Sequence, residues 1–222
     1  MEEPSLPTPT KLLVDILEGF NRKERNLLVR DILGHSEQKL RLSPDFLTRI
    51  HVETGVTLNA DAWWATDYHL DWLFAAVMVF LGTATPGQVQ ADALPPLMTA
   101  TQEDADLVIA DDRHLILIEA KAYGAYNNEQ VARKRQRFEM LQHIAGPNLD
   151  LHFLLMSPRP PQKLDHSEGV KPLKWLQLKV DPNLTVCRVE RCDAEGKTGK
   201  AGGHWKIVEH PSPPGNHSAR SN

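Results

Sequence analysis

Two carboxylates and a lysine stand at the ends of two short apolar segments near the middle of the chain. Asp106 precedes Leu107–Ala110, and Glu119 and Lys121 follow Leu115–Ile118. Neighbouring carboxylates repel each other unless a cation lies between them, and a hard ion such as Mg²⁺ prefers oxygen ligands. The ion polarises a phosphate and lowers the pKa of a bound water, while a nearby amine orients that water or accepts its proton. The trio therefore indicates metal-assisted hydrolysis of a phosphodiester.

Both apolar segments are unbroken and rich in β-branched residues, which favours strands buried on both faces. A polar segment of four residues, a length typical of hairpin loops, separates them. If these four residues form the loop, Ala110 pairs with Leu115, and Asp106 pairs with Glu119 by the same count. Lys121 lies on the face of Glu119, because side chains alternate along a strand. The alternative interpretation is an ordinary ion pair at two strand ends.

Ala105-Asp106 followed by apolar residues, and then Glu119-Ala120-Lys121, resemble the two-part signature of the PD-(D/E)XK nuclease superfamily, which has the restriction-endonuclease-like fold. Ala105 replaces the usual proline, a change that does not touch a metal ligand. The resemblance implies a nucleic-acid phosphodiesterase that uses Mg²⁺ or Mn²⁺. It also implies that Asp106, Glu119 and the Ala120 carbonyl hold the metal, and that Lys121 assists the nucleophilic water.

A basic helix is predicted from Asn127 or Asn128 to about Ile144, with an apolar stripe at helical spacing. In the resembling fold this helix flanks the active site, and a Gln or Lys on it helps to position the phosphate or the water. The alternative for each polar residue is an ordinary exposed position. Our candidates on this helix are Gln130 as a catalytic residue, and Lys134 and Arg137 as substrate-binding residues.

A further metal ligand is expected from the preceding helix, predicted over Thr66–Leu81. The resemblance implies an acidic residue there, and Asp71 is the candidate; the alternative is that Asp71 complements the charge of the helix N-terminus. Glu103 and Asp104 add acidity beside Asp106 as possible outer carboxylates. The resemblance also implies that the first strand of the core lies within Thr83–Thr101. The sequence of this segment does not show which of its residues form that strand.

Composition limits the class of protein. The chain has 222 residues, a formal net charge of -4 and a pI near 6.2, so any attraction to nucleic acid must come from a local patch. The acidic, proline-rich start contains no signal pattern, and the longest apolar run, Trp72–Leu81, is too short to cross a bilayer. Two cysteines favour a reducing, cytoplasmic setting.

These patterns predict an α/β fold: a mixed central β-sheet flanked by helices, restriction-endonuclease-like, with an N-terminal helical elaboration and a C-terminal β-hairpin. Helices are predicted over 21–33, begun by a capping box of Asn21 and Glu24, and over 43–53, begun by Ser43-Pro44. The predicted divisions are a flexible lead (1–10), the helical elaboration (11–60), the nuclease-like core (61–180), a hairpin packed on it (181–210) and a disordered tail (211–222).

A zinc site is the rival constellation in the C-terminal region. The spacing of Cys187, Cys192, His204 and His210 approaches that of a Cys₂His₂ site. Against it, the segment before the last histidine has the pattern of a strand, and the two cysteines point to opposite faces of a continuous strand.

The sequence thus predicts a Mg²⁺- or Mn²⁺-dependent nuclease, with DNA expected as the substrate ahead of RNA. The resemblance implies that the product carries a 5′-phosphate. A homodimer is a possible form, because a double-strand cutter with one site per chain needs two copies. The alternative is a nuclease-like DNA- or partner-binding module without catalysis, in a defence or repair system. Metal binding that depends on Asp106 separates the two.

Overall fold

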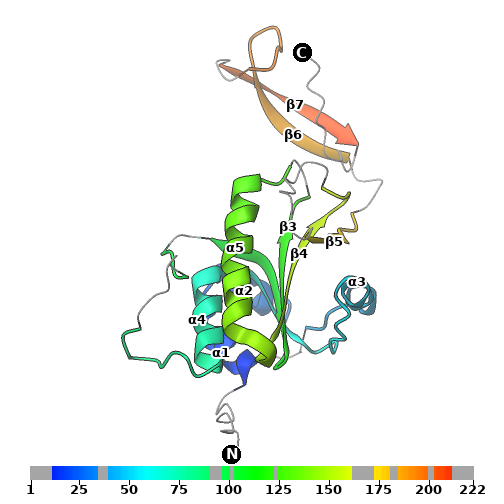
Figure 1. Cartoon of the computed structure of the whole chain (residues 1–222). Coiled ribbons are helices and arrows are strands. Elements are labelled where there is room, and N and C mark those ends of the chain that lie inside the picture. The colour runs from blue at the N-terminus through cyan, green and yellow to red at the C-terminus, as the bar shows by residue number, and fades with distance from the viewer. Residues whose placement is uncertain are drawn as a thin grey trace, which may run out of the picture.

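A five-stranded sheet in the order β1-β2-β3-β4-β5 forms the centre of the protein (Figure 1). The computed structural model describes residues 12–34, 40–90, 97–100, 103–122, 125–161, 173–180, 185–199 and 203–211, so the predicted flexible lead and all but the first residue of the predicted tail lie outside it. The predicted α/β fold with a mixed sheet, N-terminal helices and a C-terminal hairpin is confirmed. Within the described ranges, every helix is too short or too polar to cross a membrane.

The elements follow one another along the chain as helices first, then the sheet, then a separate hairpin. The central strands are β1 (Trp63–His69), β2 (Asp104–Ala110), β3 (His114–Ala120), β4 (Asp150–Ser157) and β5 (Lys174–Gln177). The helices are α1 (Leu13–Phe20), α2 (Glu24–Ile32), α3 (Pro44–Thr54), α4 (Leu70–Phe80) and α5 (Asn128–Ala145), with a 3₁₀ turn, η1 (Gly146–Asn148). The hairpin consists of β6 (Thr185–Cys192) and β7 (His204–Pro211).

The register of the central hairpin is the one expected from its loop length. β1, β2 and β3 are antiparallel, and β4 and β5 continue the sheet parallel to β3. Ala110 pairs with Leu115, as predicted, and the paired residues between β2 and β3 run as far as Leu107 and Ile118. Asp106 and Glu119 are the next residues beyond that pair, where β2 and β3 continue without paired residues, so both carboxylates stand where the hairpin opens.

Helices cover both faces of the sheet, and each face has its own core. On one face Leu17 of α1, Phe74 of α4 and Phe138 of α5 pack over the strands. On the other face Ile50 of α3 packs with Ile116 and neighbouring residues of the sheet. Burial on both faces explains the unbroken apolar runs of β2 and β3. The helix that carries the predicted substrate-binding residues, α5, therefore lies against the sheet.

The helix predicted over Thr66–Leu81 is wrong in its first turn. Residues up to His69 belong to β1, which pairs with β2, and α4 begins at Leu70. The His69 side chain caps this helix by accepting a hydrogen bond from the Asp71 backbone N–H at 3.2 Å. β1 is the first strand that the sequence did not place: it precedes α4, whereas Thr83–Thr101 contains no strand in its described residues.

The start of α2 also differs from the prediction. The helix begins at Glu24, and no side chain caps it; Asn21 instead accepts a hydrogen bond from the Lys23 backbone N–H at 3.3 Å. Asn26, on the inner side of α2, accepts a hydrogen bond from the Thr66 backbone N–H at 3.2 Å. A single side chain of α2 thus satisfies a backbone donor on the outer edge of β1, which has no strand beyond it in the sheet.

The N-terminus of α3 is capped as predicted. Ser43 Oγ accepts a hydrogen bond from the Phe46 backbone N–H at 3.2 Å, and Gly55, with φ of 82°, ends the helix. We expect Ser43→Ala to lower the free energy of unfolding by about 1 kcal/mol, because it removes this bond. Urea denaturation measures the effect. Ser43→Asn should retain most of the stability, and a loss equal to that of Ser43→Ala would contradict the capping role.

Candidate active site

The open end of the central hairpin is held by a carboxylate. Asp106 Oδ2 accepts a hydrogen bond from the Ala120 backbone N–H at 2.6 Å. This bond ties the first residues of β2 to the last residue of β3, at the point where the strand pairing has ended. Within the described residues, Asp106 Oδ1 has no hydrogen-bond partner, so one oxygen remains for a ligand.

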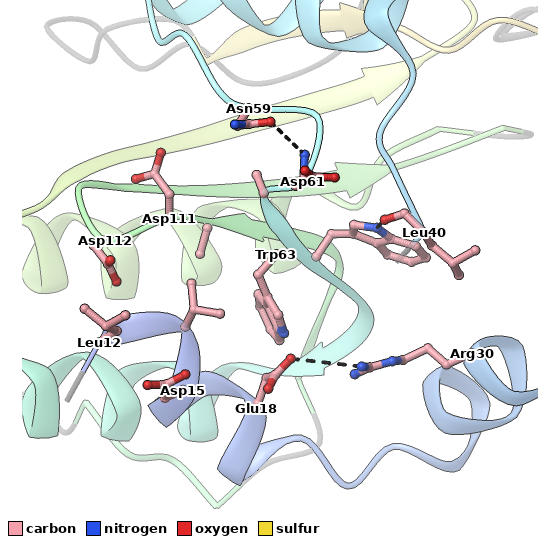
Figure 2. A pocket seen from close by; sticks show the side chains of 14 residues that line it. Leu12, Asp15, Glu18, Arg30, Leu40, Asn59, Asp61, Trp63, Asp111 and Asp112 are labelled. Atoms are coloured by element: carbon pink, nitrogen blue, oxygen red, sulfur yellow. Dashed lines mark hydrogen bonds and ion pairs between the residues drawn. The ribbon is translucent and has the colours of Figure 1, made fainter. Parts of the chain in front are cut away.

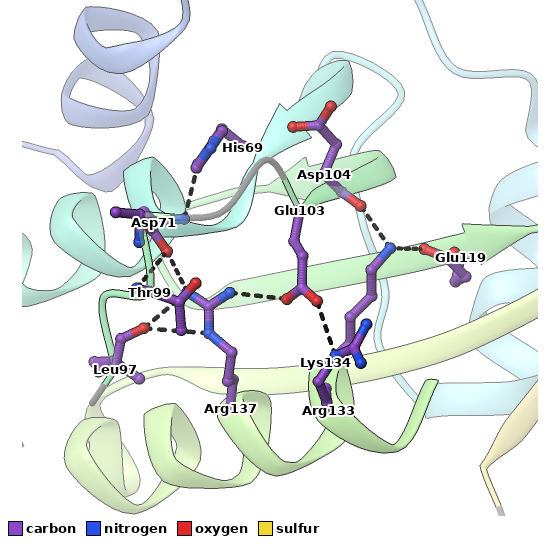
Figure 3. A network of polar contacts seen from close by, with 11 residues as sticks. His69, Asp71, Leu97, Thr99, Glu103, Asp104, Glu119, Arg133, Lys134 and Arg137 are labelled. Atoms are coloured by element: carbon purple, nitrogen blue, oxygen red, sulfur yellow. Dashed lines mark hydrogen bonds and ion pairs between the residues drawn. The ribbon is translucent and has the colours of Figure 1, made fainter. Parts of the chain in front are cut away.

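Glu119 lies beside Asp106 in a buried, charged setting. Its Oε2 accepts a hydrogen bond from Lys134 Nζ of α5 (Figure 3). Burial raises the pKa of the Glu119 carboxyl above its ordinary value; Lys134 and Lys121 oppose this shift, and the negative charge of Asp106 adds to it. The Ala120 N–H that binds Asp106 directly follows Glu119 along the chain, and Lys121 is the next residue, so the three charged residues lie together. The hairpin therefore gathers all three residues of the predicted trio.

Lys134 is not the surface residue that the sequence predicted. Its side chain is 4% exposed, and its Nζ donates to Glu119 and, at 2.7 Å, to the Asp104 carbonyl. The structure places Lys134 in a buried ion pair and not on an exposed helix face, and its role in substrate binding stays a prediction. Lys134 instead links α5 to the ends of β2 and β3.

Arg137 is also buried, one turn further along α5. Its guanidinium contacts Asp71 and donates to Glu103 at 3.1 Å and to the Leu97 carbonyl at 2.7 Å (Figure 3). It also lies over the Phe74 ring. Its side chain is 7% exposed. The guanidinium is thus enclosed among carboxylates, and the role of Arg137 in binding substrate stays a prediction.

Asp71 belongs to the same buried cluster. Besides Arg137, its carboxylate accepts hydrogen bonds from the backbone N–H groups of Thr99, at 3.3 Å, and Ala100, at 2.9 Å. These contacts favour a structural role over metal binding, since both oxygens already have donors. Asp104, one of the two candidate outer carboxylates, pairs with Lys23, the residue before α2, at 2.7 Å.

Gln130 and Lys121 keep positions from which they can reach a substrate. Gln130 is partly exposed in the first turn of α5, one turn before Lys134 and on the same side of the helix. The Lys121 side chain is exposed, and its backbone N–H donates to the Met156 carbonyl of β4 at 2.8 Å. A fixed backbone with a free side chain suits a residue that acts on a bound water.

Tyr126 is a site residue that the sequence did not reveal. Its hydroxyl donates to the Met156 carbonyl at 2.7 Å and approaches the Glu119 carbonyl at 3.3 Å. Burial raises the pKa of Tyr126 to about 12, so the hydroxyl stays protonated at neutral pH. Tyr126 thereby joins the ends of β3 and β4 beneath the carboxylates. A tyrosine in a loop carries no pattern that predicts such a contact.

Asp67 is a second residue that the sequence did not associate with the site. By the register of β1 and β2 it lies opposite Asp106, but the paired residues skip this position. Its φ of 51° is unusual for a residue other than glycine. The carboxylate lies 3.7 Å from an Arg25 nitrogen, which balances its charge.

The chemistry of the donors at the hairpin end suits a hard divalent ion. Asp106 and Glu119 each retain one carboxylate oxygen without a hydrogen-bond partner among the described residues, and the Ala120 carbonyl lies between them in sequence. Mg²⁺ commonly takes one or two carboxylates and keeps several waters, so this small donor set is sufficient. The part of the chain that the structure describes contains no group of three or more His, Cys, Asp or Glu side chains suited to a metal.

The residues of the alternative zinc site lie on β6 and β7. β6 is continuous, and Cys187 is exposed while Cys192 is buried, as expected for opposite faces. His204 pairs with Cys192 across the hairpin. The described residues of the constellation thus form no metal cluster.

Comparison with models of known protein families and with the curated proteins found no match.

A cavity of about 540 Å³ lies at the opposite end of the hairpin, beside its loop (Figure 2). Trp63 and Trp64 form part of its wall. Its acidic lining residues are Asp15, Glu18, Asp61, Asp111 and Asp112. This negative charge disfavours a polyanion. The cavity lies at the loop end of the hairpin, whereas the Asp106–Glu119 site lies at the end where the strands open, so the two are separate.

Proposed function

We propose that this protein is a divalent-metal-dependent nuclease, with DNA as the expected substrate. The observation that carries the proposal is the convergence of Asp106, Glu119 and Lys121 at one end of a buried hairpin. Asp106 and Glu119, with the Ala120 carbonyl, would hold Mg²⁺ or Mn²⁺. When bound, such an ion polarises the phosphate and lowers the pKa of an attacking water.

The residues of the chain then divide the remaining work. Lys121, exposed beside the carboxylates, orients the water and stabilises charge that develops on the phosphate. Gln130, one turn before Lys134 on the same side of α5, would position the phosphate or the water. Lys134 fixes the Glu119 carboxylate through one oxygen and leaves the other free. Tyr126 holds β3 against β4 below them.

The test is cleavage of plasmid and single-stranded DNA by the purified protein with Mg²⁺ or Mn²⁺, and its suppression by EDTA. We expect Asp106→Asn to weaken Mn²⁺ binding and cleavage by roughly 100-fold or more, because a neutral ligand replaces an anion. The amide oxygen can still accept from the Ala120 N–H, so the hairpin should remain closed. Calorimetry measures the Mn²⁺ affinity.

Asp112→Asn is the matched control, because it makes the same change at the other end of the same hairpin. Asp112 accepts a hydrogen bond from the Leu13 N–H, which asparagine can retain. Equal Mn²⁺ affinity in wild type and Asp106→Asn would overturn the metal assignment, whereas Asp112→Asn should bind Mn²⁺ like the wild type.

One observation favours the second candidate, a nuclease-like fold that binds nucleic acid or a protein partner without catalysis. Lys134 already neutralises Glu119 without a metal. A site that is electrostatically balanced in this way is stable on its own. Mn²⁺ titration separates the candidates, since the binding module predicts no Mn²⁺ affinity that depends on Asp106.

A further inference from the structure

The cations of α5 are largely neutralised by carboxylates, so this helix supplies little charge for a polyanionic substrate. Lys134 and Arg137 are buried in ion pairs. Arg133 pairs with Glu103 at 3.3 Å, and Arg135 pairs with Glu139 at 2.8 Å. Each of these four cations has a carboxylate partner, and the helix offers little net attraction to a phosphate backbone.

The C-terminal hairpin, β6 and β7, has two different faces. Directly paired residues share a face, and alternate pairs point to opposite sides. The first face carries the pairs Cys187–Glu209, Val189–Ile207 and Arg191–Trp205. The second face carries the pairs Arg188–Val208, Glu190–Lys206 and Cys192–His204.

The connecting loop covers the second face. Lys206 Nζ donates to the Gly196 carbonyl at 2.7 Å, and Thr198 Oγ1 donates to Glu190 at 3.2 Å. Thr198 also forms a β-bridge with Cys192, whose side chain is buried. The hairpin thus uses its own loop as the cover for one side.

No residue that the structure describes covers the first face, which carries large apolar side chains. Trp205 is 62% exposed, and Val189 and Ile207 are 67% and 61% exposed. Arg191, paired with Trp205, is exposed, while the carboxylate of this face, Glu209, stands four residues from Trp205 at the other end of β7. A two-stranded ribbon is marginally stable alone, so an open aromatic face of this kind points to a binding partner.

We infer that this open face binds single-stranded nucleic acid, by stacking an unpaired base on Trp205 with Arg191 beside the adjoining phosphate. Aromatic rings stack on every base irrespective of sequence, and a guanidinium supplies charge complementary to the backbone. The choice of nucleic acid as the occupant rests on the proposed function. In Figure 1 the hairpin lies beyond the end of the sheet where β3 ends and α5 begins, which is also the end that carries Glu119.

Fluorescence anisotropy of labelled oligo-dT and oligo-rU, in EDTA so that no cleavage occurs, tests the inference on the full chain. The wild type should bind a single strand more tightly than a duplex of the same length. Trp205→Leu should weaken single-strand binding by roughly tenfold or more, whereas Trp205→Phe should retain most of it. The two nucleic acids distinguish DNA from RNA as the source of the bases.

Arg191 has a matched control on the same strand. Arg188 has an equally charged, exposed side chain on the loop-covered face, next to Glu190. Arg191→Ala should weaken binding and reduce the salt dependence of log K by about 0.7, the value for one phosphate contact to a single strand. Arg188→Ala should change neither.

Several results would overturn the inference. Equal binding by Trp205→Leu and wild type, equal loss in Trp205→Leu and Trp205→Phe, or no preference for single strands would each do so. Sedimentation velocity that shows a dimer dependent on Trp205 would assign the face to a second copy instead. Because binding is measured without metal, single-strand binding through Trp205 in a protein that never cleaves would refute the nuclease and leave the inference standing.

Discussion

Lys121→Ala is expected to reduce the rate of DNA cleavage by at least about 100-fold while Mn²⁺ binding persists. The lysine side chain is exposed, yet its charge influences the buried Glu119 carboxyl, so it lies within reach of both the metal ligands and solvent. It holds no metal. Its removal should therefore act on the chemical step, which single-turnover cleavage with saturating Mn²⁺ measures.

Two further variants make this test sharper. Lys121→Arg keeps the charge but cannot accept a proton, so substantial activity would assign Lys121 to electrostatic positioning of the water. Lys179→Ala is the surface control: this lysine is 61% exposed and pairs with Asp45 on the other side of the sheet. Cleavage by Lys121→Ala at the wild-type rate would refute the proposed active site.

Arg137→Met is expected to lower the free energy of unfolding by about 3–5 kcal/mol, because it leaves the mostly buried Asp71 carboxylate without a cation and removes the buried partner of Glu103. The two carboxylate side chains are each 15% exposed, and the Arg137 side chain is 7% exposed. Methionine retains much of the arginine volume, so the loss reports charge more than packing. Urea denaturation monitored by circular dichroism gives the difference.

Arg133→Met is the matched control on the same helix. Arg133 also pairs with Glu103, but its side chain is 62% exposed, so solvent screens the pair and the cost should stay within about 1 kcal/mol. Adding Asp71→Asn to Arg137→Met should recover part of the stability, because asparagine removes the unpaired negative charge at position 71. If Arg137→Met is as stable as Arg133→Met, the cluster does not stabilise the fold.

Local sequence determined the central hairpin and its chemistry. Two unbroken apolar runs and a four-residue loop were sufficient to predict the Ala110–Leu115 pair, and hence the position of Asp106 and Glu119 at the open end. Ser43-Pro44 and Asn127 likewise predicted helix starts, because a cap depends on residues within one turn of it. These features need no information from distant parts of the chain.

Tertiary structure decided which charges are free and where the first strand lies. Thr66–His69 is strand because β2 offers it a pairing edge, a fact absent from its own residues. Lys134 and Arg137 have the spacing of an exposed basic face, but Glu119, Glu103 and Asp71 meet them in the fold. Helical spacing predicts which residues share one side of a helix. Which segments cover that side depends on residues 15 or more positions away, as for Lys134 and its partner Glu119.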